Sequence, residues 1–355
     1  MPRYYPIRYM DDAAAQTRII DRLLALREKL AAEIEPHRKP GSLLLATWNI
    51  REFGREKPKH GRRLPEALHY MAEIISRFHL VAVQEVNRDL TEFNALLKLL
   101  GPDWDAILTD ITEGTGGNEE RMAFLFDKRF VRFRNIAGEI VLPTGVRVTD
   151  KDGEADELQF ARTPFMVAFQ ADWWKFNLCT VHIYYGKDSG AKLQRRIDEI
   201  EEVAKFFKKR QQKETGDYVL LGDFNIVSPE HETMLALKKH GFRVPENLQK
   251  EKTNLKGDKH YDQIAFKPQK KMVEVGASGV FDFDEAVFRP EDRDVYVPFM
   301  EKAAGKEGGA LTRYYNTWRT FQMSDHLPMW TELKVDFTED YLESLRPGEK
   351  PLADS

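Results

Sequence analysis

The sequence is poor in cysteine and has no long apolar run. Cys179 is its single cysteine among 355 residues, so no disulfide can form within the chain. No apolar run approaches the roughly 18 residues that a membrane helix needs, and residues 1–12 lack the apolar core of a signal peptide. These absences predict no membrane span and favour a reducing, cytoplasmic compartment. Because Cys179 lies in an apolar strand pattern, we expect a buried structural thiol there.

A strong net charge is also missing. Lys and Arg number 54 and Asp and Glu 58, which gives a formal charge of -4. This balance argues against a protein that coats nucleic acid through its global charge, but it permits an enzyme with a local basic groove. Hydrophobic residues make up 42% and aromatic residues 11% of the chain, enough for a substantial core. No obligate protein partner can be inferred from these features.

The chain begins with a helical pattern and continues with mixed strands and helices. Residues 11–35 predict a helix, and its expected apolar stripe is Ile20, Leu23, Leu24, Leu30 and Ile34. We expect residues 1–41 to form an appendage that packs on the main domain, with a dimer contact as the alternative. Strands are predicted at 43–50, 80–86, 121–126, 164–171, 176–185, 218–226, 261–266 and 328–335, and helices at 64–78, 90–100, 192–209 and 230–240. Such mixing predicts sheet layers covered by helices over a domain at 42–337.

Residues 284–320 and the C-terminal residues differ from this pattern. The 284–320 stretch is charged, contains glycine and is rich in aromatic residues. We expect an insertion loop that is either a functional lid or a surface addition. Residues 338–355 are expected to be a C-terminal tail.

Polar residues stand where several predicted strands end. They are Asn49, Glu85, His182, Asp223, Asn225, Asp262, Asp325 and His326. One such residue is usually a turn, a cap or a structural side chain, but so many in one chain are harder to explain that way. Carboxylate and amide oxygens suit Mg²⁺, and imidazoles transfer protons near neutral pH. The set therefore indicates hydrolysis at phosphorus.

Short motifs around these residues resemble a known family. The run Trp48-Asn49-Ile50-Arg51-Glu52-Phe53-Gly54 is similar to the first motif of the endonuclease/exonuclease/phosphatase superfamily, and to its deoxyribonuclease I-like branch in particular. The later motifs follow in that family's order: Gln84-Glu85-Val86, Val181-His182, Gly222-Asp223-Phe224-Asn225, Tyr261-Asp262-Gln263-Ile264 and Ser324-Asp325-His326-Leu327-Pro328. As an ordered set over residues 43–335 they are specific.

The resemblance implies a fold and a metal site. The fold would be a four-layer α/β/β/α sandwich of two packed, mostly antiparallel sheets (an α/β or α+β protein), with the site at one edge. Glu85, with Asn49 and Asp325 nearby, would hold a divalent metal. Mg²⁺ is the implied cofactor, and Mn²⁺ is a possible substitute.

The resemblance also implies roles in proton transfer and charge stabilisation. Asp262 would orient His326, while His182 would lie on the other side of the scissile phosphate. Glu120 matches the carboxylate that pairs with that histidine. Asp223 would either activate the attacking water or bind a second metal, and Asn225 would donate to a phosphoryl oxygen. Whether a histidine or an aspartate is the general base stays open at this point.

Basic residues favour nucleic acid as the substrate, with DNA first. Arg51 stands where the deoxyribonuclease branch has a DNA-contacting arginine, and the segment containing Arg162 resembles one whose arginine approaches a phosphate. The basic loop at 55–63 follows the first motif and is either a phosphate contact or a solvated charged loop. The sequence therefore predicts a metal-dependent nuclease that cuts DNA as an endonuclease.

Two departures from the branch weaken the expected grip on duplex DNA. Asn118 stands where an aromatic residue is expected, and Asn87 followed by Arg88 stands where an arginine is expected. Aromatic residues of 296–321 would then stack on unpaired bases or would simply pack the insertion. The alternatives are a phosphoesterase acting on a small phosphoester or phospholipid headgroup, and a non-catalytic binding protein on the same fold.

Overall fold

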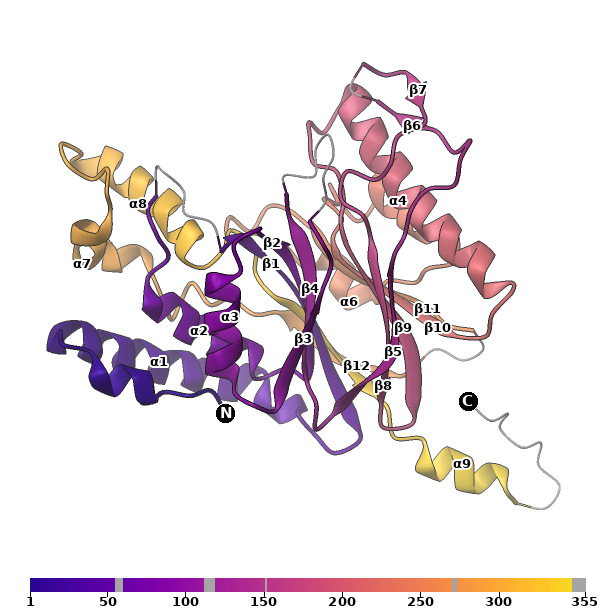
Figure 1. The fold of residues 1–355 in the computed structure, drawn as a ribbon, viewed down its shortest axis with the longest axis horizontal. Coiled ribbons are helices and arrows are strands. Elements are labelled where there is room, and N and C mark those ends of the chain that lie inside the picture. Colours follow the sequence, from indigo (N-terminus) through magenta and orange to yellow (C-terminus); the bar gives the residue numbers. More distant parts are fainter. Residues whose placement is uncertain (55–59, 112–118, 151, 270–272, 347–355) are drawn as a thin grey trace.

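Two β-sheets pack face to face in the computed structural model, which describes residues 1–54, 60–111, 119–150, 152–269 and 273–346 (Figure 1). The first sheet has the order β12-β13-β1-β2-β4-β3 and the second β11-β10-β9-β8-β5. The first comprises β1 (Ser42–Phe53), β2 (Leu80–Val86), β3 (Trp104–Leu108), β4 (Arg121–Asp127), β12 (Val275–Val280) and β13 (Met329–Lys334). The second comprises β5 (Val131–Glu139), β8 (Phe165–Ala171), β9 (Trp174–His182), β10 (Asp217–Asp223) and β11 (Asp262–Lys267). A short hairpin is formed by β6 (Val148–Thr149) and β7 (Ala155–Asp156).

Helices cover the outer faces of both sheets, which gives the expected four layers (Figure 1). Only the central pairs β1–β2 and β9–β10 are parallel, and the other neighbours run antiparallel. The helices of the first side are α1 (Ala13–Glu33), α2 (Pro65–Ile75) and α3 (Thr91–Leu100), and those of the second are α4 (Gly190–Gln211) and α5 (Glu232–Lys238). The remaining helices are α6 (Glu246–Lys250), α7 (Arg293–Tyr296), α8 (Gly308–Gln322), α9 (Thr338–Ser344), and the 3-10 turns Tyr5–Tyr9, Glu35–His37, Pro290–Asp292 and Val297–Phe299.

Strand β1 shows why this sequence forms a central strand. Its residues are almost all buried on both faces of the sheet. This burial explains why the first half of the strand is a continuous apolar run and does not alternate between apolar and polar residues. Leu43 and Leu45 belong to the core between the two sheets, whereas Leu44 and Trp48 pack in the core under the helices of the first sheet. The same alternation directs Asn49 toward the second sheet.

The N-terminal helix packs on the first side, but through a different stripe from the one predicted. Ile20 and Leu24 are exposed at 43% and 59%, while Ile19 and Leu26 are buried with Leu23, Leu30 and Ile34. The prediction was wrong at Ile20 and Leu24, because the helix turns Ile19 and Leu26 into the core instead. In this orientation Arg18 reaches Glu66 of α2 at 2.8 Å. Small shifts of this kind are invisible to a pattern that contains adjacent apolar residues.

The 284–320 stretch and the predicted tail contain helices that the sequence pattern did not indicate. In α8, Tyr315 and Trp318 are three residues apart and therefore lie on the same face of the helix. Both are buried and pack with Phe288 and Tyr296. Most of these aromatic residues therefore pack the insertion itself. Strands β3, β5 and β12 were also missed. All three lie at sheet edges, and in addition β5 is largely exposed and β12 is rich in glycine, so their hydrophobic patterns are weak.

Within the described residues, no helix has both the length and the apolar character needed to cross a bilayer.

Candidate active site

The predicted site residues come together at one edge of the sandwich, where strands of both sheets end (Figure 1). Asn49 and Glu85 lie near the ends of β1 and β2 in the first sheet, and His182 and Asp223 end β9 and β10 in the second. Asp262 opens β11, opposite Asp223 in the ladder. Because parallel neighbours end at the same edge, each sheet presents two polar side chains to the other.

Asn49 links the two sheets at the bottom of this site. Its Nδ2 donates to Glu85 Oε1 at 2.9 Å and to Asp223 Oδ2 at 3.0 Å. Asn49 is fully buried, and its Oδ1 has no hydrogen-bond partner among the residues that the structure describes. An unpaired buried carbonyl oxygen beside two carboxylates is costly in a dry protein interior, so this group is suited to a cation.

Glu85 is held by an unusual backbone conformation. Its φ is +61°, in the left-handed region, and the β1–β2–β4 ladder shifts register around it. The shift allows the backbone N–H of Glu52 to donate to Glu85 Oε2 at 2.9 Å. Burial raises the pKa of Glu85, and nearby Glu120 and Asp325 act in the same direction against the lowering by His182. Strain and burial at one carboxylate are typical of a functional position.

His326 lies between two carboxylates. Its Nδ1 is 2.8 Å from Asp262 Oδ2, and its Nε2 is 3.8 Å from Asp223 Oδ2. Burial lowers the pKa of His326, but Asp262 and Asp223 outweigh it and raise the pKa well above the usual value. Asp262 thus fixes the orientation of the ring and its other nitrogen faces the site.

His182 has a corresponding carboxylate on the opposite side of Asp223. Its Nδ1 lies 3.0 Å from Glu120 Oε2, and its Nε2 lies 3.6 Å from Asp223 Oδ2 and 4.0 Å from Glu85 Oε1. Burial raises the pKa of Glu120, but His182 and Arg162 overcome this and lower it to about 2. Glu120 therefore stays ionised as a partner of the imidazole.

Arg162 is placed behind His182 by the same carboxylate. Its Nε donates to Glu120 Oε2 at 2.6 Å and its Nη2 to Glu120 Oε1 at 3.4 Å, and both residues are buried. The guanidinium expected near a phosphate is thus bound within the protein. This arrangement holds Glu120 in place for His182.

Arg51 and Asp325 also contact each other at 3.1 Å. Arg51 Nη1 donates to Thr320 Oγ1 at 2.7 Å, and its guanidinium lies 4.0 Å from the ring centroid of Phe321. The end of α8 therefore supports one wall of the site. The insertion is connected to the catalytic residues, although the sequence alone left its position open.

Asn225 completes the group around Asp223. Its φ is +53°, its backbone N–H donates to Asp223 Oδ1 at 2.9 Å, and its Nδ2 donates to the carbonyl of Ile183 at 2.9 Å. One N–H of the side-chain amide is used by Ile183, which leaves the second for another acceptor.

Two buried polar residues hold the site together and were given no role from the sequence. Ser324 Oγ donates to the carbonyl of Asn49 at 2.6 Å and accepts from the backbone N–H of His326 at 3.0 Å. Gln84 Nε2 donates to Thr180 Oγ1 at 2.8 Å and to Thr47 Oγ1 at 3.1 Å, which joins the sheets directly below the site. Both residues lie inside motifs that resemble those of the family, and this position was the one sign in the sequence that they could support the site.

Two groups of side chains around Asp223 can hold a divalent ion. Asp223, Asp262 and His326 offer ligand atoms within 4.8 Å of one another. Asn49, Glu85 and Asp325 offer oxygen atoms, which Mg²⁺ prefers, and they include the unpaired Oδ1 of Asn49.

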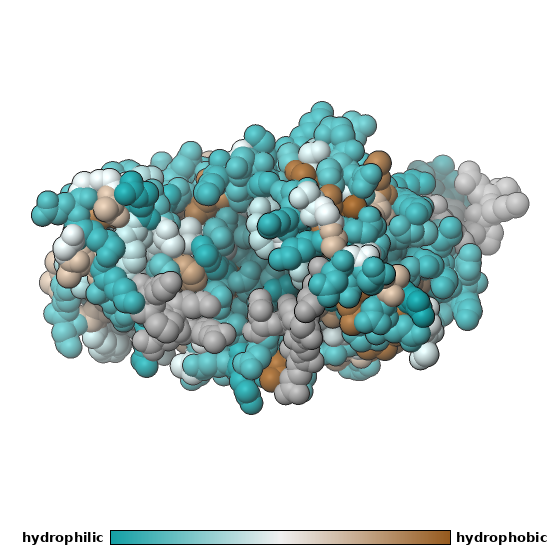
Figure 2. Space-filling view, turned by 90° about the horizontal axis from the view of Figure 1, so that it is seen from above, coloured by the Kyte–Doolittle hydropathy of each residue, from teal (hydrophilic) through white to brown (hydrophobic). Residues whose placement is uncertain are grey.

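The surface over the site is hydrophilic and hollowed. Seen toward this edge, it dips between the part that carries α7 and α8 and the part that carries α4 (Figure 2). Asn87 is buried and Arg88 is exposed. Most of the basic loop expected at 55–63, and Asn118 with the glycines before it, lie outside the described residues.

Comparisons with known proteins identify the family and the fold. Residues 46–325 match the model of the endonuclease/exonuclease/phosphatase family, and no curated protein sequence matches the chain. A family protein from Bacteroides thetaiotaomicron is similar in structure, with a TM-score of 0.55 and 17% identity over 84% of this chain and 99% of that one. The mannosyl-6-phosphatase of B. thetaiotaomicron VPI-5482 is similar with a TM-score of 0.54 and 16% identity, over 82% of this chain and 99% of that one. TDP2 of D. rerio, complexed with single strand DNA product, is similar with a TM-score of 0.51 and 15% identity, over 82% of this chain and 98% of that one. At these identities the likeness establishes the fold.

Proposed function

Because this chain belongs to the endonuclease/exonuclease/phosphatase family, we propose that it is a divalent-metal-dependent phosphodiesterase that cuts nucleic acid, with DNA as the first substrate and internal cutting as the mode. The observation that carries the proposal is the convergence of two carboxylate-held imidazoles on Asp223, at 3.6 Å and 3.8 Å. Hydrolysis of a phosphodiester needs a deprotonated attacking water and a protonated leaving oxygen, and this arrangement supplies groups for both.

Asn49, Glu85 and Asp325 would hold Mg²⁺, with Mn²⁺ as a substitute. When bound, the ion would neutralise charge on a phosphate oxygen and on the leaving oxygen. The donor set fits this role, because Asn49 Oδ1 is buried without a partner in the described part of the chain and Glu85 lies beside Asn49. Arg51 Nη1, 3.1 Å from Asp325, would keep that carboxylate in place.

The two imidazoles would act from opposite sides of the phosphate. Asp262 fixes His326 so that its Nε2 faces the site, and Glu120 faces Nδ1 of His182. Asp223 lies between both rings and would position the attacking water or accept its proton. The second amide N–H of Asn225 would donate to a phosphoryl oxygen as charge develops there.

A second candidate substrate is a small phosphomonoester, such as a sugar phosphate. One observation favours it, because the two arginines expected to grip a nucleic acid backbone are already paired with carboxylates: Arg162 with Glu120 in the interior, and Arg51 with Asp325 at the surface. The structural likeness to a mannosyl-6-phosphatase points in the same direction. The likeness to a protein crystallised with a DNA product supports the nuclease.

Incubation of the purified protein with supercoiled plasmid and with p-nitrophenyl phosphate separates the two candidates. Each substrate is tested with Mg²⁺ and with excess EDTA, and Glu85→Gln protein purified in parallel detects contaminating nucleases. We expect Mg²⁺-dependent plasmid nicking that the variant lacks. Release of nitrophenol with an intact plasmid would instead assign the site to small phosphoesters.

A further inference from the structure

Tyr185 is an exposed aromatic residue at the mouth of the site. It follows β9 three residues after His182, and 55% of its side chain is exposed. Three residues of extended chain span at most about 11 Å, so the ring lies close to the scissile position. A single exposed aromatic residue is common on protein surfaces, but Tyr185 is also held by neighbouring side chains.

A buried arginine lies behind the Tyr185 ring. The guanidinium of Arg196 is 5.6 Å from the ring centroid, and the Arg196 side chain is entirely buried. Arg196 Nη1 donates to Asp188 Oδ1 at 2.9 Å and to the carbonyl of Asn225 at 3.1 Å. The cation that backs Tyr185 is thus bonded to the same loop that carries Asn225.

A second aromatic ring connects Tyr185 with the catalytic histidine. Tyr261 meets Tyr185 edge to face, with centroids 6.3 Å apart and planes at 86°. Tyr261 also stacks on His326, with centroids 5.5 Å apart and planes at 28°. Tyr185 is therefore braced from one side by a cation and from another by a ring, while over half of its side chain remains open to solvent.

We propose that Tyr185 is a stacking platform for an unpaired nucleobase next to the scissile phosphate, so that the preferred substrate is single-stranded nucleic acid. This inference rests on the proposed nuclease function and adds the form of its substrate. A rigid, solvent-facing ring loses little side-chain freedom on binding, and it accepts any base because every base has a π-face. A paired base is covered by its neighbours in the duplex and cannot lie flat on the ring.

The platform predicts a binding difference that depends on the base. Stacking on an aromatic side chain is worth about 1–3 kcal/mol per base, which is about 5- to 150-fold in affinity at 1.36 kcal/mol per tenfold change. Loss of the ring should weaken binding of a strand with bases by this factor. It should leave binding of a strand without bases unchanged.

The test uses two labelled strands of about ten nucleotides, one of deoxyadenosine and one entirely abasic. Binding is measured by fluorescence anisotropy in EDTA, and cleavage in Mg²⁺, for the wild type, Tyr185→Leu and Tyr185→Phe. Tyr9→Ala serves as a control, because Tyr9 is 75% exposed and lies near the N-terminus, away from the site. We expect the wild type, Tyr185→Phe and Tyr9→Ala to prefer the base-containing strand, and Tyr185→Leu to lose that preference.

The outcomes separate this inference from the proposed function. Equal binding of both strands by the wild type, or an unchanged preference in Tyr185→Leu, overturns the platform even when Mg²⁺-dependent cleavage is observed. Base-dependent binding that Tyr185→Leu abolishes, without any cleavage, supports the platform and overturns the nuclease function. Tighter binding of mannose 6-phosphate than of the deoxyadenosine strand, lost in Tyr185→Leu, would assign the ring to sugars.

Discussion

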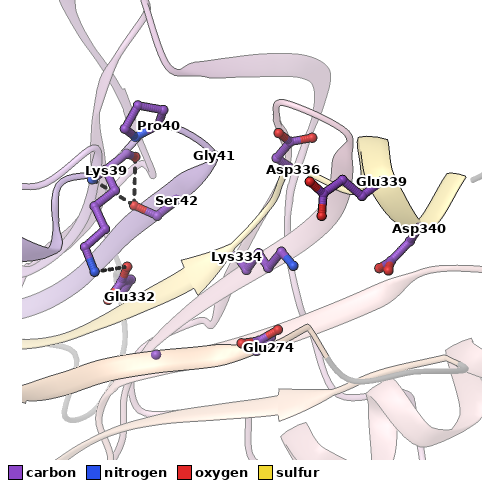
Figure 3. Close-up of a pocket in the computed structure, with 11 residues that line it drawn as sticks. Lys39, Pro40, Gly41, Ser42, Glu274, Glu332, Lys334, Asp336, Glu339 and Asp340 are labelled. Atoms are coloured by element: carbon purple, nitrogen blue, oxygen red, sulfur yellow. Dashed lines mark hydrogen bonds and ion pairs between the residues drawn. The ribbon is translucent and has the colours of Figure 1, made fainter. Parts of the chain in front are cut away.

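At the edge where β1 and β2 end, Asp223 and Asp262 are buried and each contacts an imidazole. At the opposite end, where β1 begins, acidic side chains line an open pocket of about 350 Å³ (Figure 3). The pocket's acids come from β13, α9 and the residues beside them: Glu274, Glu332, Asp336, Glu339 and Asp340. Both ends are rich in carboxylates, but Asp223 and Asp262 are buried, whereas Glu274, Glu339 and Asp340 of the pocket are exposed.

This contrast shows that a well-formed hollow is weaker evidence of function than buried charge. An exposed carboxylate is hydrated and costs nothing to keep, whereas a buried one must be compensated by cations or hydrogen bonds. Glu274, Glu339 and Asp340 are exposed, and the partly buried Glu332 is paired with Lys39 at 3.9 Å and His37 at 3.4 Å. Among the described residues, we therefore assign the chemistry to the buried edge and no ligand to the open pocket.

The strongest way to break this comparison is to remove the imidazoles and, separately, the pocket acids. Replacing both His182 and His326 by alanine should reduce hydrolysis by several orders of magnitude, because each proton-transfer group contributes about 10²–10⁴-fold and the two act together. Replacing the exposed Glu274 and Glu339 by glutamine should leave kcat/KM within about twofold, as expected for surface substitutions. Both are measured on the substrate identified by the plasmid test.

Circular dichroism and thermal melting control for folding in both double variants. Full activity without the histidines would remove our assignment of the site. A comparable loss in the glutamine variant would show instead that the pocket takes part in the reaction.

A second prediction sharpens the comparison from below the site. Gln84 is fully buried and joins Thr180 of the second sheet to Thr47 of the first. In Gln84→Leu these hydroxyls lose their partner, which should cost about 1–3 kcal/mol of stability. Because Glu85 and Asn49 would then move relative to His182, we expect kcat to fall about 10- to 100-fold.

Thr180→Val provides the matched control, since it removes one hydroxyl and keeps the side-chain volume. It should show a smaller decrease in kcat with a nearly unchanged KM. If Gln84→Leu lost stability while kcat was preserved, Gln84 would be a structural residue without a positioning role.

The sequence predicted which polar residues meet at the site better than it predicted the contacts that support them. Asn49, Glu85, His182 and Asp223 were recognisable because each follows an apolar run, and the family order then indicated that they meet. The pairing of Arg162 with Glu120 was not foreseen, because a guanidinium has the same sequence signature whether it binds a phosphate or a carboxylate.

Edge strands and helix rotation were beyond the reach of the pattern for other reasons. β5 is mostly exposed, so hydrophobic alternation is weak there. The stripe of α1 contains neighbouring apolar residues, Ile19 and Ile20, and only packing against α2 decides which one is buried. The role of Tyr185 depends on Arg196 and Tyr261, which are distant from it in the chain and are brought together only by the fold.

The smallest predicted effect concerns a titrating residue at the far end of the sheets. His79 is buried, and its Nδ1 accepts from the backbone N–H of Leu44 at 2.9 Å, so the folded protein requires the neutral ring. Burial, aided by the charge of Arg38, lowers the pKa of His79 to about 3, from an ordinary value of 6.5. Its stabilising contribution is therefore complete above pH 6.5 and is lost as the pH falls toward 3.

Chemical denaturation at pH 8 and pH 5 measures this contribution. The wild type should lose about 2 kcal/mol more than His79→Gln over this range, because 1.5 pH units correspond to about 2 kcal/mol for one group. The activity of His79→Gln at pH 8 should match that of the wild type, since the residue lies at the end away from the site. An equal loss in both proteins would show that His79 titrates normally, and a loss of activity would mean that the two ends are coupled through β1 and β2.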